Sequence, residues 1–333
     1  MPANLTPEYR KAEQAYREAK TDEERLACLE EMLACIPKHK GTEKMQADLK
    51  QRIARLRSKP SSSQAGARQR DIFHVERSGA GQVVLLGLPN SGKSALVGAL
   101  SKGRVTVADY PFATHAPVPG MAHYEDVPIQ LVDMPPFTPG SMVPGMMGAY
   151  RAADVILIVV DLAAPDALEQ LEACLDVLAR RGIAPVGRPV GHDERDAEDR
   201  QLKTALIAGT KADVEGAGET FDALAELYDG RLPMVRVSAH EARSLRQLTA
   251  RLFDLLQVVR VYCKEPGEEP DLEVPFVLGR GSTVVDLARA VHREFPDKLQ
   301  YACVWGSAKF DGLQVTRDHV LEDGDIVELH VAG

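Results

Sequence analysis

The stretch GLPNSGKS, residues 87 to 94, decides the fold because it has the spacing of a phosphate-binding loop. Gly87 is followed by four residues and then by Gly92, Lys93 and Ser94. In such a loop, backbone N–H groups surround the phosphates, the lysine reaches the terminal phosphates, and the serine hydroxyl is a ligand of Mg2+. The apolar run QVVLL precedes the loop, and the helix-compatible run ALVGAL follows it. This strand–loop–helix context predicts a P-loop nucleotide site.

Glycines in this stretch serve the phosphate contact directly. Glycine tolerates positive φ and leaves room where a larger side chain would block the phosphates. A glycine-rich turn without a ligand is the alternative, but the flanking strand and helix argue against it. We therefore expect the nucleotide phosphates to contact Gly87, Asn90, Ser91, Gly92, Lys93, Ser94 and Ala95.

From about residue 80 onward, apolar strand-like runs alternate with helix-like segments. This alternation predicts an α/β fold, a doubly wound parallel sheet with helices on both faces. Phosphate-binding loops lie at the carboxyl ends of such strands, which is where the P-loop falls. The strands are expected at Val83–Leu86, Ile129–Val132, Val155–Val160, Ala205–Ile207 and Met234–Val237.

The pattern differs on both sides of this region. Residues 1–58 show helix caps and an apolar stripe at Leu49, Ile53 and Leu56, which predicts a helical basic arm. Residues 59–79 begin in a Ser-, Gly- and Pro-rich run and predict a flexible linker. The nucleotide domain is then expected over residues 80–259. Residues 260–333 predict a small mixed domain, with short strands around one helix from Val284 to Phe295.

Composition indicates a globular, cytoplasmic protein. The chain has 333 residues, of which 44% are hydrophobic, and no apolar run reaches the roughly 18 residues that span a membrane. Its beginning, MPANLTPEYRK, lacks the apolar segment of a signal peptide. Its five cysteines are scattered and odd in number, which favours reduced thiols. Neither the cysteines nor the histidines show metal-ligand spacing along the sequence.

The net charge of −9 is unevenly distributed. Residues 38–77 hold 11 Lys and Arg side chains against 4 acidic ones, so the rest of the chain is strongly acidic. A basic segment of this kind either meets RNA phosphates or is a solvated helix face. The sequence leaves both interpretations open.

Two later stretches indicate guanine. Thr210, Lys211 and Asp213 belong to TKAD, which follows the strand ALIAG. An aspartate there accepts hydrogens from the ring nitrogen and the exocyclic amine of guanine, an edge that adenine does not present. Ser238 and Ala239 follow the next strand, where a backbone N–H meets the guanine oxygen. The TKAD stretch therefore disfavours one alternative function, that of an ATP-using P-loop enzyme.

The metal and the terminal phosphate have their own candidates. Asp133 ends the strand IQLVD, where its carboxylate holds the hydration shell of Mg2+. Thr114 lies in PFATHAPVPG, a loop expected to close over a triphosphate and to supply a further Mg2+ ligand. An ordinary loop threonine is the alternative for Thr114. The predicted metal ligands are thus Ser94, Thr114 and Asp133.

In this order, GLPNSGKS, DYPFATHAPVPG, DMPP, TKAD and VSAHE resemble the Obg-related GTPases, closest to the developmentally regulated GTP-binding protein branch. The C-terminal stretch, with RVYCKEPGEEPDL, YACVWGSAKFDG and EDGDIVELHV, resembles their TGS domain, a ubiquitin-like β-grasp module. The resemblance covers residues 80 to 333. It implies a slow GTPase switch that binds GTP and GDP with Mg2+ and associates with ribosomes or RNA through the TGS domain.

Two positions bear on hydrolysis. Many small GTPases have a water-positioning glutamine just after the aspartate motif, whereas Phe137 stands here. Similar GTPases with Asn90 at its P-loop position use its amide oxygen to hold a K+ ion that neutralises developing phosphate charge. The alternative is that Asn90 only satisfies the backbone of its own turn. The catalytic candidates are therefore Asn90, Lys93, Thr114 and Asp133.

Two further departures concern the switch and the base. Where the family has Asp-x-Pro-Gly, this chain has Pro136, which lacks the N–H that contacts the terminal phosphate. Where the family has asparagine, this chain has Thr210, whose hydroxyl can still brace the loop. Two functions of different class remain: a GTP-hydrolysing switch, and an RNA- or ribosome-binding adaptor that holds guanine nucleotide with little or no turnover.

Overall fold

A computed structural model describes most of the chain beyond residue 72. The chain forms two compact units, Met1–Arg70 and Asp71–Gly333. The described residues are 16, 28–29, 31–33, 35–36, 46, 49–50, 52–53, 73–101, 116–138, 145–191, 194, 196–197, 200–228 and 230–332.

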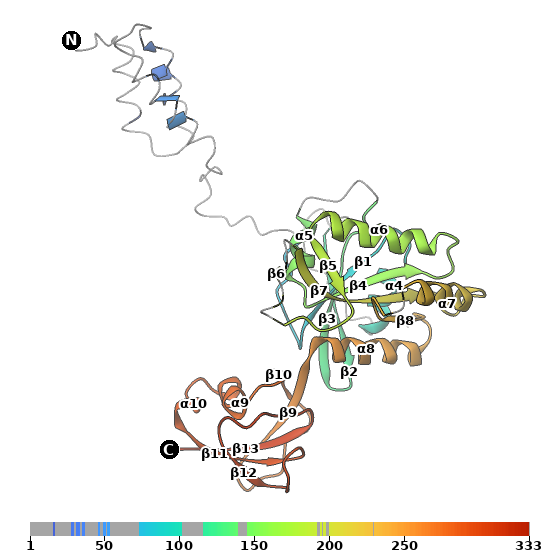
Figure 1. Cartoon of the computed structure of the whole chain (residues 1–333). Coiled ribbons are helices and arrows are strands. Elements are labelled where there is room, and N and C mark those ends of the chain that lie inside the picture. Colours follow the sequence, from blue (N-terminus) through green and yellow to red (C-terminus); the bar gives the residue numbers. More distant parts are fainter. Residues whose placement is uncertain are drawn as a thin grey trace, which may run out of the picture. The chain divides into compact units, whose positions relative to one another are not determined.

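An eight-stranded sheet forms the centre of the nucleotide-binding part (Figure 1). Its strand order is β2-β3-β1-β4-β7-β5, with β6 and β8 also paired to β7. All pairs are parallel except β2–β3 and β6–β7. The strands are β1 (Gln82–Leu86), β2 (Val118–Tyr124), β3 (Val127–Asp133), β4 (Val155–Asp161), β5 (Ile183–Val186), β6 (Asp196–Ala197), β7 (Arg200–Thr210) and β8 (Met234–Arg236).

Helices pack on both faces of this sheet, so the predicted doubly wound fold is confirmed. One buried cluster joins α5 (Met146–Ala152), α6 (Ala167–Arg180) and α7 (Ala217–Tyr228) to one face. A second cluster joins α4 (Lys93–Leu100) and α8 (Ala242–Leu256) to the other. Side chains alternate between the faces of a strand, so successive residues of β1 enter the two cores in turn. The central strands are apolar on both faces, as buried parallel strands require.

The C-terminal module is a five-stranded mixed sheet in the order β10-β9-β13-β11-β12. Its central pair, β9 and β13, is parallel, and its other pairs are antiparallel. Helix α9 packs on one face of this sheet, which gives the predicted β-grasp arrangement. The elements are β9 (Val258–Lys264), β10 (Phe276–Gly279), α9 (Val284–Val291), α10 (Phe295–Lys298), β11 (Leu299–Trp305), β12 (Leu313–Val315) and β13 (Asp325–Val331).

Most of the described residues of the first unit are helical. Leu29, Met32, Ile36, Leu49 and Ile53 form a buried cluster of their own. Two members of the predicted apolar stripe therefore lie in this cluster, while Leu56 lies outside the described residues. The same holds for most of the predicted linker.

Several elements differ from the sequence prediction, which did not include β5 or β6. The helix predicted to extend from Val284 to Phe295 ends at Val291, because His292 is extended and a separate short helix begins at Phe295. The prediction also missed β2, which contains Pro119 and Gly120. Proline is tolerated there because β2 is at the sheet edge. The domain boundaries remain predictions, although Phe73 already packs in the main core.

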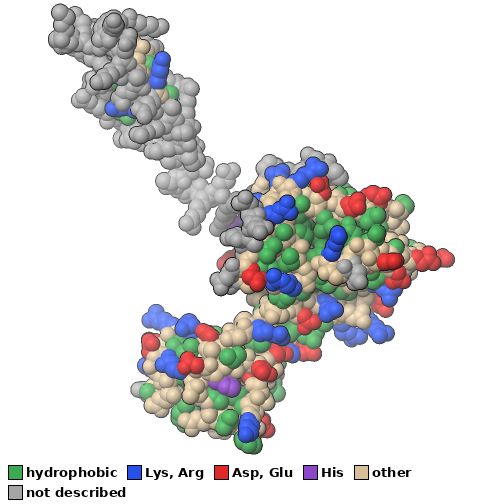
Figure 2. Space-filling model, viewed as in Figure 1, with side chains coloured by type: hydrophobic (Ala, Val, Ile, Leu, Met, Phe, Trp, Pro, Cys, Tyr) green, Lys and Arg blue, Asp and Glu red, His purple; other side chains and the backbone are tan. Residues whose placement is uncertain are grey.

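Several observations bear on the membrane and redox predictions. Within the described ranges, no helix is both long enough and apolar enough to cross a membrane. Figure 2 shows charged side chains of both signs on the visible face of the described residues. The apolar run at 155–161 is the buried strand β4. All five cysteines are free thiols.

Candidate nucleotide site

The phosphate loop connects the end of β1 to the start of α4. Asn90 and Gly92 both have positive φ, 62° and 88°, which lets the chain curl between them. A Cβ at Gly87 would lie 2.7 Å from the carbonyl oxygen of Val159, so a larger residue there would force β4 away. The loop therefore has the backbone form that its glycine spacing predicts.

Lys93 is buried and points back into the loop. Its ammonium donates hydrogen bonds to the carbonyl oxygens of Gly87 and Leu88, each at 2.9 Å, and lies 3.4 Å from Ser91 Oγ. Burial lowers the pKa of Lys93, whereas the nearby Asp133 carboxylate raises it. The side chain is thus held where phosphate oxygens can replace the loop carbonyls as its partners.

Ser94 and Asp133 lie in direct contact. The Ser94 hydroxyl donates to Asp133 Oδ2 at 2.5 Å, although the two residues are 39 positions apart. Burial raises the pKa of Asp133, and the hydrogen bond from Ser94 partly opposes this. The other oxygen, Oδ1, is buried and has no hydrogen-bond partner among the described residues. A hydroxyl and an unsatisfied carboxylate oxygen are donors that fit Mg2+.

These side chains surround one cavity of about 700 Å3. The predicted contact residues from Asn90 to Ala95 all border it, as does Asp133. Thr114 lies outside the described residues, so its contribution remains a prediction. The cavity is lined by Pro89, Asn90, Ser91, Gly92, Lys93, Ser94, Ala95, Ala116, Val118, Asp133, Met134, Pro135, Pro136 and Lys211.

Thr210 braces the phosphate loop against the base-binding side. Its hydroxyl donates to the Ser91 carbonyl oxygen at 2.7 Å and lies 3.1 Å from that of Val160. A threonine therefore makes the connection for which the family resemblance implies asparagine. Lys211 follows with φ 55° and forms an ion pair with Asp161 at 2.5 Å.

Asp213 and Ser238 come together at the ends of neighbouring strands. A hydrogen bond from Ser238 is the main cause that lowers the pKa of Asp213. The backbone supports this contact, since Ala212 N–H donates to the Val237 carbonyl oxygen at 3.3 Å. Ser238 N–H donates to Ser244 Oγ at 3.1 Å, which fixes the loop that leads into Ala239. Asp213 itself is exposed, as a base-contacting group requires.

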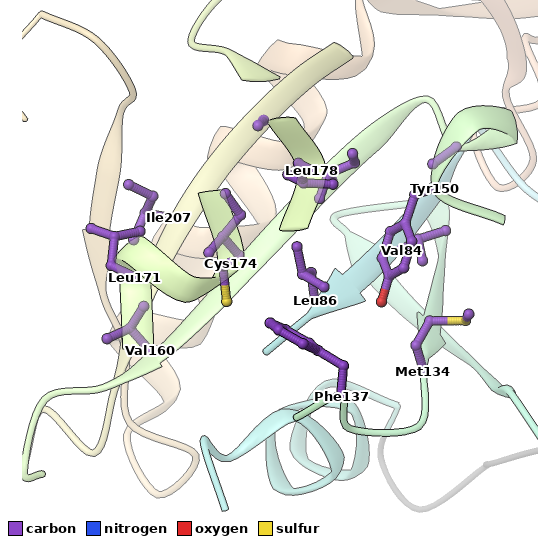
Figure 3. Close-up of a cluster of buried hydrophobic side chains, with 14 of the residues drawn as sticks. Val84, Leu86, Met134, Phe137, Tyr150, Val160, Leu171, Cys174, Leu178 and Ile207 are labelled. Carbon is purple, nitrogen blue, oxygen red and sulfur yellow. The ribbon is translucent and has the colours of Figure 1, made fainter. Parts of the chain in front are cut away.

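The segment after Asp133 is anchored in the core. Phe137 is 2% exposed and belongs to the cluster that includes Leu86 and Cys174. Figure 3 shows its ring directed toward those side chains, among buried residues. Pro136 is exposed and borders the nucleotide cavity. Phe137 therefore has no access to an attacking water, and the methionine-rich stretch that follows supplies core residues at Met146 and Met147.

Sequence reasoning missed Asp161 as part of the site. In the sequence it directly follows the predicted strand Val155–Val160. That position was a usable signal, because residues ending parallel strands gather at one sheet edge. Asp161 is 7% exposed, and its Oδ1 accepts a hydrogen bond from Ala163 N–H at 3.0 Å. It orients Lys211 at the rim of the cavity.

Comparisons with known proteins agree with this geometry. The family model described as 50S ribosome-binding GTPase matches residues 82–186. The model described as TGS domain matches residues 259–331, which covers the second sheet.

Proteins that match this chain over most of its length are named as GTP-binding proteins or G-proteins. Developmentally-regulated G-protein 2 of Arabidopsis thaliana is 30% identical over 92% of this chain and 90% of that protein. A GTP-binding protein of Methanocaldococcus jannaschii is 28% identical over 92% of both chains. Among solved structures, the G domain of the T. maritima FeoB iron transporter is 23% identical, with a TM-score of 0.39, over 53% of this chain and 98% of that chain.

Proposed function

Because the chain belongs to the developmentally regulated GTP-binding protein family, we propose that it is a slow, Mg2+-dependent GTPase that acts as a cytoplasmic switch in ribosome- or RNA-related processes. The family membership gives guanine-nucleotide binding and a GTPase domain. One observation carries the step to hydrolysis: Lys93, Ser94 and Asp133 line one cavity, with Asp133 Oδ1 buried and unpartnered among the described residues.

Ser94 and Asp133 would hold Mg2+, with Thr114 joining them when triphosphate is bound. The ion supplies neutralisation of the phosphate charge. Lys93 adds a positive charge on the terminal phosphates, and the backbone N–H groups of the loop orient them. Hydrolysis is slow because Phe137 is packed in the core and cannot orient water.

A monovalent cation would offset the missing glutamine. Asn90 borders the cavity and has a left-handed backbone conformation. Its amide oxygen is a suitable K+ ligand beside the phosphates. A held K+ stabilises charge that develops during phosphate transfer, as an arginine finger does elsewhere.

We expect single-turnover GTP hydrolysis to be faster in KCl than in NaCl by at least about tenfold. Asn90→Gly removes the amide but tolerates the positive φ of this position, so it should lose the KCl acceleration and keep the NaCl rate. Phosphate release by rapid quench measures both. Equal rates in the two salts would eliminate the K+ proposal, while GTPase activity itself would stand.

The same assay addresses the second candidate function. Pro136 and Phe137 favour an adaptor that holds guanine nucleotide with little or no turnover. That function predicts no phosphate release above background in either salt. Background is set by the Lys93→Met variant, which keeps the length of the side chain without its charge.

The ribosome or RNA role rests on the basic segment, residues 38–77, and on the TGS module. Residues 71–333 are a compact unit by themselves, so deletion of residues 1–70 leaves the nucleotide site in place. The full chain should co-sediment with ribosomes or RNA at 50 mM salt and lose most of that binding at 200 mM. The shortened chain should bind at least about tenfold more weakly at low salt, with a smaller salt dependence. Unchanged binding would remove the electrostatic role.

A further inference from the structure

A mixed set of metal-ligating side chains lies on the C-terminal sheet, remote in sequence from the nucleotide motifs. It consists of Cys303 on β11 and of Glu328 and His330 on β13. The thiol sulfur, a carboxylate oxygen and an imidazole nitrogen all lie within 4.8 Å of one another. Sequence spacing gave no sign of this set, because 25 positions separate the cysteine from its nearest partner.

Strand register brings the three donors together. Cys303 is directly opposite Glu328 in the β11–β13 ladder, and Tyr301 is opposite His330. Residues two apart on a strand point to the same face, so all three donors share the face that does not carry α9. Their neighbours Ala302 and Val327 point the other way, into the module's core. The donors are therefore fixed on paired strands rather than on a loop.

The side chains around the cluster hold it in one arrangement. The His330 ring stacks on Tyr301 with centroids 4.3 Å apart and planes at 16°. His330 Nε2 lies 2.7 Å from Glu328 Oε1. Lys264 Nζ lies 3.2 Å from the second carboxylate oxygen and 5.1 Å from the Trp305 ring. One oxygen of Glu328 is thus satisfied by lysine, and the other is shared with the imidazole.

We propose that Cys303, Glu328 and His330 bind one Zn2+ ion on the C-terminal sheet. Sulfur, nitrogen and oxygen donors suit zinc, whereas Mg2+ and Ca2+ prefer oxygen alone. Around a tetrahedral ion with bonds of about 2.0 to 2.3 Å, donors are about 3.5 Å apart, so the farthest pair closes by about 1 Å. Three protein ligands leave the fourth position to water.

Binding is a ligand exchange without electron transfer. The Cys303 thiol releases its proton to solvent and binds as thiolate. His330 binds Zn2+ through Nε2 as the neutral imidazole whose single hydrogen is on Nδ1, and any other ring proton leaves to solvent. The ion then lies between Nε2 and Glu328 Oε1. Lys264 stays on the other carboxylate oxygen. Thiolate and carboxylate together neutralise the dication.

Lys264 allows a second test of the proposal, in which a substitution is expected to strengthen metal binding rather than weaken it. Its ammonium is a cation beside the site, and it opposes the arrival of another cation. Lys264→Gln removes that charge but keeps a hydrogen-bond donor for Glu328. This variant should bind the metal more tightly than the natural chain, whereas a merely structural ion pair would show no metal binding in either.

Cobalt(II) tests the site, because it takes zinc's place and reports a bound thiolate by a charge-transfer absorption in the near ultraviolet. The probe is Co2+ added to the chelator-treated, nucleotide-free full chain with a reductant that contains no thiol. We expect one equivalent to produce the thiolate band and Zn2+ to abolish it. The oxygen ligands Ser94 and Asp133 cannot produce this band.

Two cysteines of the same module make a matched pair. Cys263 is on β9 opposite Val327, whose side chain is in the core, so it lies on the other face of the sheet. Cys263→Ser should keep the cobalt band, Cys303→Ser should lose it, and His330→Ala should weaken Co2+ binding at least about tenfold. Thermal unfolding of the metal-free variants checks that each is folded. Absence of the band in the natural chain, or its persistence in Cys303→Ser, would overturn the site.

Discussion

Replacement of Asp213 by asparagine is expected to exchange guanine for xanthine as the preferred base. We expect the Asp213 carboxylate to accept hydrogens from the guanine ring N–H and amino group. Ser238 donates to it and lowers its pKa, so the group is ionised at neutral pH. Asparagine presents an N–H where guanine's amino group also donates, so two donors would oppose each other. Xanthine has a carbonyl oxygen at that place and fits the amide.

We expect GDP affinity to fall by on the order of 10^4 in Asp213→Asn, and XDP affinity to rise above that for GDP. Isothermal calorimetry with both nucleotides measures the exchange. The control is Asp222→Asn, the same chemical change at an exposed position of α7. GDP binding as in the natural chain, with no gain for XDP, would show that Asp213 does not contact the base.

The nucleotide site could be predicted from local motifs because each motif lies at the carboxyl end of an apolar strand. The P-loop follows β1, Asp133 ends β3, and Thr210 ends β7. In a parallel sheet these ends meet at one edge, so order along the chain is sufficient to place them. The same rule extends to Asp161, which ends β4 and pairs with Lys211.

What the sequence could not supply depends on contacts between distant positions. Strand β2 was missed because Pro119 and Gly120 have low strand propensity, and pairing with β3 outweighs it. The Thr210 hydroxyl bond to Ser91 spans 119 positions. Likewise, no spacing rule along the sequence links Cys303 to His330. The register of the β11–β13 pair places them close together.

The burial of Phe137 could not be predicted from the sequence either. An aromatic residue at this position is compatible with a side chain that faces the nucleotide or one that faces the core. Tertiary packing decides, and here Leu86 and Cys174 receive the ring. The consequence is a segment after Asp133 that is fixed at both ends, with Pro135 and Phe137 buried around the exposed Pro136.

That fixed segment makes Pro136 the position at which triphosphate sensing is open to change. Pro136→Ala supplies an N–H at the edge of the nucleotide cavity, where we expect the terminal phosphate, and the backbone there is not in the left-handed region, so alanine fits without strain. A hydrogen bond to a charged oxygen contributes about 1.5 to 3 kcal/mol. The ratio of GTP to GDP affinity should therefore increase by about tenfold to a hundredfold, measured with a non-hydrolysable GTP analogue. Pro165→Ala, the same change at an exposed turn outside the cavity lining, should leave the ratio unchanged. An unaltered ratio in Pro136→Ala would mean that the missing N–H does not limit the switch.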